Sequence, residues 1–193
     1  MTDFVERLGA MVISPRETLE QLSKERALRD AFIVVLLAGA FAGILLGMLL
    51  PRMMPPELIP LIPLDFTGLF ILGLTSTLLS WVIYVGILHL VAKLIGGKGE
   101  YSMLLHLIGY AYVPYLLIYP LSLVTWFISP LLSSLIDLIG FVWYCVLTIF
   151  AISIAERFSI LRAAITVVGS VVAIIVLAVV VIALMAIAGI PLA

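Results

Sequence analysis

The chain has 193 residues, of which 65% are hydrophobic and 11% are charged, and its formal net charge is −1. Soluble domains average about 45–50% apolar and about 25% charged residues, so a soluble core could not hide this much apolar surface. The basic residues form no patch of the kind that binds nucleic acid, and the single Cys145 excludes a disulfide framework and a thiol metal site. The composition predicts an all-α integral membrane protein that is embedded in the lipid bilayer and interacts with it.

Residues 1–30 are predicted to form an amphipathic cytoplasmic segment. They carry eleven charged side chains, so we expect no cleavable signal peptide. Ser14, Pro15 and Glu17 predict the start of a second short helix, with Ser14 as cap and Glu17 closing a capping box. The segment either lies on the lipid headgroups or forms a docking site for a soluble partner. Its first helix shows apolar residues at helical spacing, which are Phe4, Leu8, Met11 and Val12.

Residues 31–193 are predicted to form a bundle of about five transmembrane helices. Each apolar stretch is long enough to cross a hydrocarbon core of about 30 Å, which takes about 20 helical residues. Only Ser129 and Pro130 separate the third stretch from the fourth. An alternative ends the third near Ser122 and begins the fourth near Asp137, with 123–136 in the outer headgroup layer. The predicted spans are 31–50, 66–95, 103–128, 131–155 and 163–190.

The basic residues predict the orientation of the bundle. Nine of the ten Lys and Arg residues fall beside the ends of the spans that share a side with the N-terminus, and only Arg52 falls on the other side. Because cytoplasmic loops are enriched in Lys and Arg, we expect a multi-pass protein of the cell membrane with its N-terminus in the cytoplasm and its C-terminus outside. The outer loop Pro51–Asp65 holds five prolines, which predicts a stiff, extended spacer rather than a ligand site.

Gly39, Gly43 and Gly47 follow one another at intervals of four residues along the first span. Small residues at this spacing allow another helix backbone to approach closely, which favours helix packing in a membrane. We expect this face to pack inside the bundle, and a homodimer seam is the alternative.

Three ionisable residues fall within or near the predicted spans. His89 and His106 flank one hairpin turn, so they share a layer near the cytoplasmic surface, where Glu100 could reach either ring. They are interpreted as interfacial or packing residues, with a proton or substrate site as the alternative. Asp137 is either the cap of the fourth helix or an immersed carboxyl group beside Tyr115 or Tyr119. Without a third ligand they predict no metal site, and we expect no catalytic site and no cofactor.

The third span contains Pro114 and Pro120, and two prolines in one span interrupt its backbone hydrogen bonds. Such breaks line binding sites in transporters, and they also occur as inert kinks. We expect a kink.

Three short segments are distinctive, which are Pro15-Arg16-Glu17-Thr18-Leu19, Gly96-Gly97-Lys98-Gly99-Glu100-Tyr101 and Gly109-Tyr110-Ala111-Tyr112-Val113-Pro114. They resemble the prokaryotic branch of the Yip-domain family, whose eukaryotic members interact with Ypt/Rab proteins. The resemblance implies five spans, a cytoplasmic N-terminus and, for the eukaryotic members, a role in vesicle traffic through prenylated GTPases. This chain lacks the Asp-Leu-Tyr-Gly-Pro element and the long acidic N-terminal region of that branch, which argues against GTPase binding.

These patterns predict a non-enzymatic membrane scaffold that associates with itself, as a homo-oligomer, or with another membrane protein. The alternative is a small permease, channel or lipid-moving protein that uses the broken third span. A continuous polar cavity at mid-membrane would favour the permease, and a closed bundle packed by Gly39 and Gly43 would favour the scaffold.

Overall fold

The computed structural model describes residues 4–25, 28–55 and 65–187. Within these residues the chain is helical and contains no strand, which confirms the all-α class. Most of the proline-rich loop predicted as a spacer lies outside the described residues. The helices are α1 (Phe4–Ile13), α2 (Pro15–Leu22), α3 (Leu28–Met53), α4 (Phe66–Leu94), α5 (Tyr101–Ala111), α6 (Val113–Trp126), α7 (Pro130–Ala155) and α8 (Ile160–Ile187).

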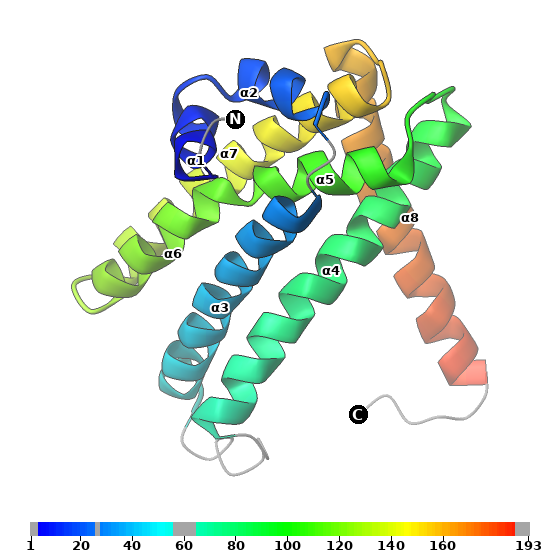
Figure 1. The fold of residues 1–193 in the computed structure, drawn as a ribbon. Helices are drawn as coiled ribbons and strands as arrows, with labels where there is room; N and C mark the ends of the chain where they lie inside the picture. Colours follow the sequence, from blue (N-terminus) through cyan, green and yellow to red (C-terminus); the bar gives the residue numbers. More distant parts are fainter. Residues whose placement is uncertain (1–3, 26–27, 56–64, 188–193) are drawn as a thin grey trace.

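Five segments in the described part of the chain are long and apolar enough to cross a membrane, as predicted. They are α3, α4, α5 together with α6, α7, and α8. The third segment is interrupted at Tyr112, where α5 ends and α6 begins, and Pro114 lies in the first turn of α6. Proline suits that position because the first turn of a helix needs no backbone N–H donor. Figure 1 shows α5 passing across the upper part of the bundle before α6 descends.

The fourth span begins at Pro130, and the alternative start near Asp137 would have been later in the chain. Ser129 is the N-cap of α7, and its hydroxyl accepts a hydrogen bond from the Leu132 N–H at 3.4 Å. Residues 130–136 are therefore helical, and the alternative start of the fourth helix near Asp137 is wrong. Asp137 lies two turns inside α7 with an exposed side chain, so its interpretation as a helix cap is also wrong.

The capping box predicted at Ser14 does not form. Pro15 begins α2 as expected, but the Ser14 side chain makes no capping hydrogen bond. The Thr18 hydroxyl instead donates to the Ser14 carbonyl at 2.8 Å. The start of α2 is thus defined by the fixed φ of proline and by Thr18, a residue that the capping pattern did not include.

Glycines bring α3 and α4 into close contact, and Figure 1 shows the two helices side by side. A Cβ atom added at Gly43 would overlap the Phe70 carbonyl oxygen, and one added at Gly73 would lie 2.5 Å from the Cα of Gly43. A Cβ at Gly39 would meet Leu74 at 3.2 Å, and one at Gly47 would meet the Phe66 ring at 2.7 Å. All three glycines of the predicted stripe therefore face α4 of the same chain.

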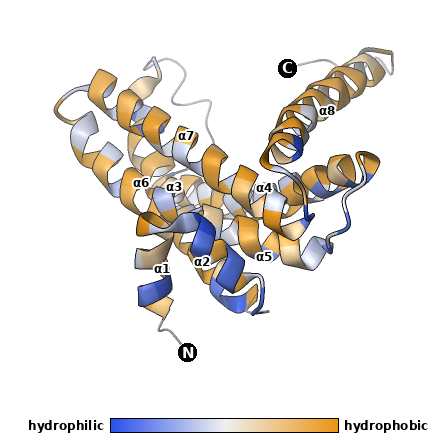
Figure 2. Cartoon of the chain, turned by 90° about the horizontal axis from the view of Figure 1, so that it is seen from above, coloured by the Kyte–Doolittle hydropathy of each residue, from blue (hydrophilic) through white to orange (hydrophobic). Residues whose placement is uncertain are grey.

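The helices α1 and α2 pack against the end of the bundle that also carries the α4–α5 and α7–α8 turns. We call this end the N-terminal face. Met11 and Leu19 are fully buried there, and Phe4 and Leu8 pack against the same core. The predicted apolar stripe of the first helix thus faces mostly protein rather than lipid. Figure 2, seen from above, shows hydrophilic residues concentrated in α1, α2 and the neighbouring turns.

Of the five candidate spans, the last one, α8, is the least buried. Its first half contacts α4 and α7, where Thr166 and Ser170 are fully buried. Beyond these residues its apolar side chains are exposed, and Figure 1 shows α8 diverging from α4. One span therefore presents most of its surface to the bilayer.

We expect Gly43→Ala to destabilise the protein and Gly86→Ala to leave it as stable as the parent or slightly more so. An added Cβ overlaps α4 at Gly43, and overpacking costs about 1–3 kcal/mol. It meets nothing within 4 Å at Gly86, and alanine is the better helix former. Thermal unfolding in detergent, with light scattering for oligomer size, measures both variants. Equal melting temperatures for Gly43→Ala and the parent would contradict this account of the α3–α4 contact.

Candidate functional site: a buried carboxylate at the N-terminal face

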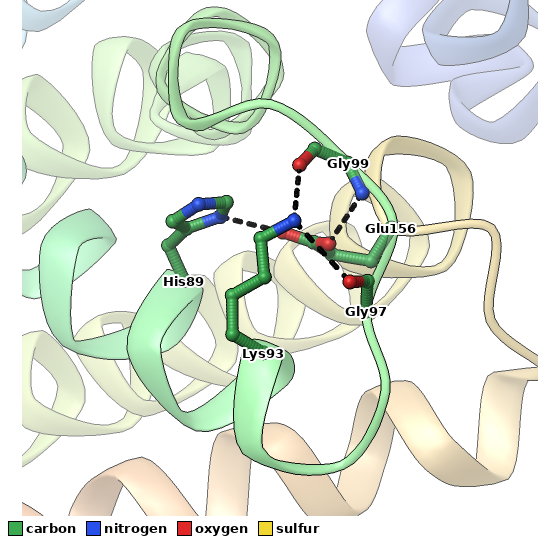
Figure 3. A network of polar contacts seen from close by, with 5 residues as sticks. All are labelled: His89, Lys93, Gly97, Gly99 and Glu156. Carbon is green, nitrogen blue, oxygen red and sulfur yellow. Dashed lines mark hydrogen bonds and ion pairs between the residues drawn. The ribbon is translucent and has the colours of Figure 1, made fainter.

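Polar groups of α4 and of the turn after it form a cluster around Glu156 at the N-terminal face (Figure 3). Glu156 ends α7 as its C-cap residue, and its side chain is fully buried. His89 and Lys93 come from the last two turns of α4, and Gly97 and Gly99 come from the turn that joins α4 to α5. Residues far apart in the sequence thus form one cluster.

Each carboxylate oxygen of Glu156 has its own hydrogen-bond partner. Nδ1 of His89 lies 2.7 Å from Oε1, so an N–H at this ring position donates to the carboxylate. The backbone N–H of Gly99 donates to Oε2, also at 2.7 Å. The Lys98 N–H donates more weakly, at 3.4 Å, to the Glu156 carbonyl. Because hydrogen bonds to a charged group replace its lost hydration, this geometry permits a carboxylate to be buried.

Lys93 holds the turn from its other side. Its ammonium group donates to the carbonyls of Gly97 at 3.2 Å and Gly99 at 2.7 Å. Gly99 is therefore bound through both of its backbone polar groups, by Glu156 and by Lys93.

The glycines of the Gly96–Glu100 turn are explained by this cluster. Gly96 has φ = +92°, which L-residues with a side chain rarely adopt. A Cβ at Gly97 would lie 2.6 Å from Oε2 of Glu156, and a Cβ at Gly99 would overlap the Ala155 carbonyl. The turn fits closely around the end of α7, where Arg157 has φ = 57°. The glycine-rich turn that resembles the family segment thus accommodates and binds the Glu156 side chain.

Sequence reasoning missed Glu156. Glu156 is the carboxylate that binds Nδ1 of His89. The available signal was an acidic residue at the end of an apolar span, followed by Arg157, opposite a turn rich in glycine. That signal is weak, because an acid at a helix end is also typical of a solvated surface.

The structure does not bring His89 and His106 into one site. His106 is buried in α5, where its ring lies edge-on to Tyr110 with 5.4 Å between the ring centroids. It lines a small cavity of about 60 Å³ with Leu28, Ser102 and Met103. His89 is bound to Glu156, so the two imidazoles have different surroundings.

A second polar cluster attaches the N-terminal helices to the bundle. Arg7 of α1 forms ion pairs with Glu25 at 2.8 Å and Asp30 at 3.3 Å. Tyr110 and the two carboxylates raise the pKa of Arg7, and burial opposes them. Arg7 stays charged at physiological pH, and its ion pair with Asp30 attaches α1 to α3.

The remaining predicted residues lie apart from these clusters. Gly109 packs against α3, since a Cβ there would lie 2.7 Å from that of Ala31. Asp137 is near the stacked pair of Tyr115 and Tyr119, whose ring centroids are 4.8 Å apart. It is separated from Glu156 by about 28 Å along α7.

The Glu156 cluster can fix the Gly96–Glu100 turn against the end of α7. Among the described residues, no group of three or more His, Cys, Asp or Glu side chains could hold a metal ion. Every polar atom named in the cluster contacts another group of the protein, which is the arrangement of a structural clamp.

A family model, the Yip1 domain, matches residues 9–182. The chain belongs to the Yip1 domain family. Neither a curated protein nor a solved structure matches the chain. The match includes the glycine turn, the broken third span and Glu156, so the Glu156 cluster lies within the Yip1 domain, whereas Arg7 lies two residues before the matched region. With five candidate spans, this Yip1 domain protein is a multi-pass membrane protein.

We expect Glu156→Ala to loosen the Gly96–Glu100 turn and to destabilise the protein. The change leaves the buried donors of His89 and Gly99 without an acceptor, at about 1–3 kcal/mol. Glu156→Gln keeps an acceptor oxygen, so it should lose less stability than Glu156→Ala. Hydrogen exchange of residues 95–100 and thermal unfolding are the measurements.

Glu17→Ala is the matched control, because Glu17 is an exposed carboxylate on α2 at the same face. It should leave both measurements unchanged. Parent-like exchange of the turn in Glu156→Ala would show that Glu156 does not hold it.

Proposed function

We propose that this Yip1 domain protein is a non-enzymatic scaffold of the cell membrane, which associates with itself or with another membrane protein through its spans. The proposal rests on one observation, which is that the polar groups of both clusters bind other parts of the protein. His89, Lys93 and Glu156 hold one turn, and Arg7 attaches α1, so these groups are engaged in positioning the N-terminal face. Residues 1–30 and the bundle 31–193 are proposed to work as one unit for this reason.

The close packing of α3 and α4 supports a scaffold over a permease. Gly43 and Gly73 leave no room between the two backbones. The cavity that reaches the middle of the bundle lies instead between α4, α7 and α8, and its wall is mainly aliphatic and aromatic. An ion or a polar solute crossing the membrane needs polar groups along its path, and such a wall offers few.

The rival function, a permease, channel or lipid-moving protein, has one observation in its favour. The third span is broken at Tyr112, and Tyr112 lines that same cavity. Reconstituted protein that moves ions or fluorescent lipids across vesicles, at a rate that depends on Tyr112, would favour the rival.

The association surface is proposed to be the outward face of α8. The glycine stripe of α3 faces α4 within the chain, so it leaves little surface for a homodimer. On α8, four exposed residues recur at helical spacing and point away from α4. They are Val168, Val172, Ile175 and Val179.

We expect a photocrosslinking residue at Val172 or Ile175 to give protein–protein crosslinks in native membranes. The outward face of α8 is then in contact with a second protein, either another copy or a partner, and mass spectrometry of the crosslinked band identifies it. Ile139 on α7, which is 61% exposed, is the matched lipid-facing control. A crosslink yield at Val172 and Ile175 no higher than at Ile139 would refute this surface.

The N-terminal face is proposed to be cytoplasmic. It carries Arg7, Lys93, Lys98, Arg157 and Arg162, whereas Arg52 lies in the last turn of α3 at the opposite face. Moving a cationic residue to the bilayer centre costs about 2.5–3.5 kcal/mol on the insertion scale, so the inverted orientation would require many such transfers.

In a Cys145→Ser background, we expect Met53→Cys to react with a membrane-impermeant maleimide in intact cells and Lys98→Cys to react only after permeabilisation. Both positions are exposed, so accessibility in the folded protein does not differ between them. Labelling of Lys98→Cys from outside, with Met53→Cys protected, would reverse the orientation.

A further inference from the structure

A groove opens sideways from the bundle between α4, α7 and α8, with a volume of about 780 Å³. Towards the N-terminal face it is closed where α8 meets α4, since a Cβ at Gly169 would lie 3.1 Å from Val91. Below that contact the two helices diverge (Figure 1). The walls are apolar and include Leu79, Ile83, Phe141, Val171, Ile174 and Leu177.

Hydroxyl groups form the floor of this groove at mid-membrane depth. Ser80 lies at the middle of α4, and Tyr144 lies near the middle of α7. The Tyr112 ring packs edge-on against Tyr144, with 5.2 Å between the ring centroids, and Tyr84 borders the same space. Water does not reach this depth, so a hydroxyl there gains from any hydrogen-bond partner that a neighbouring molecule supplies.

The shape of the groove favours a lipid over a helix from another protein. Along α4 it extends from Ser76 to Ile87, which is about 16 Å. It is closed at one end by the contact of α8 with α4, whereas a helix that crosses a membrane of about 30 Å would have to continue past that end. The volume of the groove falls within the range of about 300–1,000 Å³ that is typical of small-molecule sites.

The hydroxyl floor favours one class of lipid. A phospholipid keeps its glycerol, ester and phosphate groups in the headgroup layer, so its chains would offer the floor no hydrogen-bond partner. A neutral lipid with one polar oxygen can carry that oxygen deeper, because it has no charge to desolvate.

We propose that the groove binds a neutral lipid, with a long hydrocarbon chain and a single hydroxyl or carbonyl oxygen. The oxygen hydrogen-bonds to the hydroxyls of Tyr112, Tyr84 and Ser80, and the chain lies along Ile83 and Val171 towards the open side. This site is independent of the scaffold function, because it uses the face of α8 that is turned towards α4 rather than the outward face.

The test uses the full chain, purified in phosphatidylcholine nanodiscs, and a long-chain fatty alcohol that carries a diazirine. We expect mass spectrometry to find the label on Ile83, Val171 or Leu177, and unlabelled alcohol to compete with it. A phosphatidylcholine with the diazirine in one acyl chain is the comparison probe, and we expect it to label these residues less and without competition by the alcohol.

Variants that remove one hydroxyl at a time decide the role of the floor. Tyr112→Phe and Tyr84→Phe should each reduce labelling by the alcohol roughly three- to tenfold, as expected for one lost hydrogen bond. Tyr119→Phe is the matched control, since Tyr119 lies on α6 outside the groove, and it should label like the parent. Ser80→Phe, which fills the groove, should abolish labelling there by both probes.

Equal labelling by the two probes, unaffected by Tyr112→Phe and Tyr84→Phe, would overturn the proposal, because the groove would then hold only bulk lipid chains. A second copy of the chain crosslinked through Ile83 would overturn it as well. If Tyr112→Phe lowers the melting temperature, Tyr84→Phe and Ser80→Ala carry the test, since both residues are more exposed.

Discussion

Glu156 has no contact with solvent, and a carboxylate can be buried at tolerable cost only where hydrogen bonds replace its hydration. Its two oxygens bind the last turns of α4 and the turn that leads into α5, while its backbone ends α7 and leads towards α8. The ends of four helices therefore meet at this one residue. Its hydrogen bond from Gly99 joins the Gly96–Glu100 turn to α7, whereas Lys93 holds that turn from α4.

This clamp and the Arg7 cluster divide the protein into a firmly connected end and a less connected one. At the N-terminal face, ion pairs and hydrogen bonds link α1, α3, α4, α7 and the turns between them. Towards the opposite face, packing between α3 and α4 and between α6 and α7 continues, whereas α8 separates from its neighbours. The groove and the outward face of α8 both result from this divergence.

The sequence was sufficient for the class, the number of spans and the use of proline at Pro15 and Pro114. Apolar runs of span length are a strong signal, because a membrane admits few alternatives to a helix. Local sequence patterns predicted less well which side chains contact one another. Asp137 and Ser129 both suit an N-cap, and only the start of α7 shows which one serves. His89 and Glu156 are 67 residues apart, so no spacing rule joins them. The glycines at 97 and 99 were conspicuous, but the group that they accommodate was not.

The third span has a consequence for how the protein enters the membrane. Of the five candidate spans, Tyr101–Trp126 is the least hydrophobic and the most buried, with Tyr110, Tyr112 and His106 facing protein. A helix of this composition gains little from lipid alone, because insertion depends on the summed transfer energies of its residues. Its stable integration has to be coupled to contact with α3 and α7, which bracket it in the order of synthesis. The last span, α8, is the most hydrophobic and the least buried, so it can partition into the bilayer without such help. Biogenesis of this protein thus combines a span that enters the membrane cooperatively with one that enters autonomously.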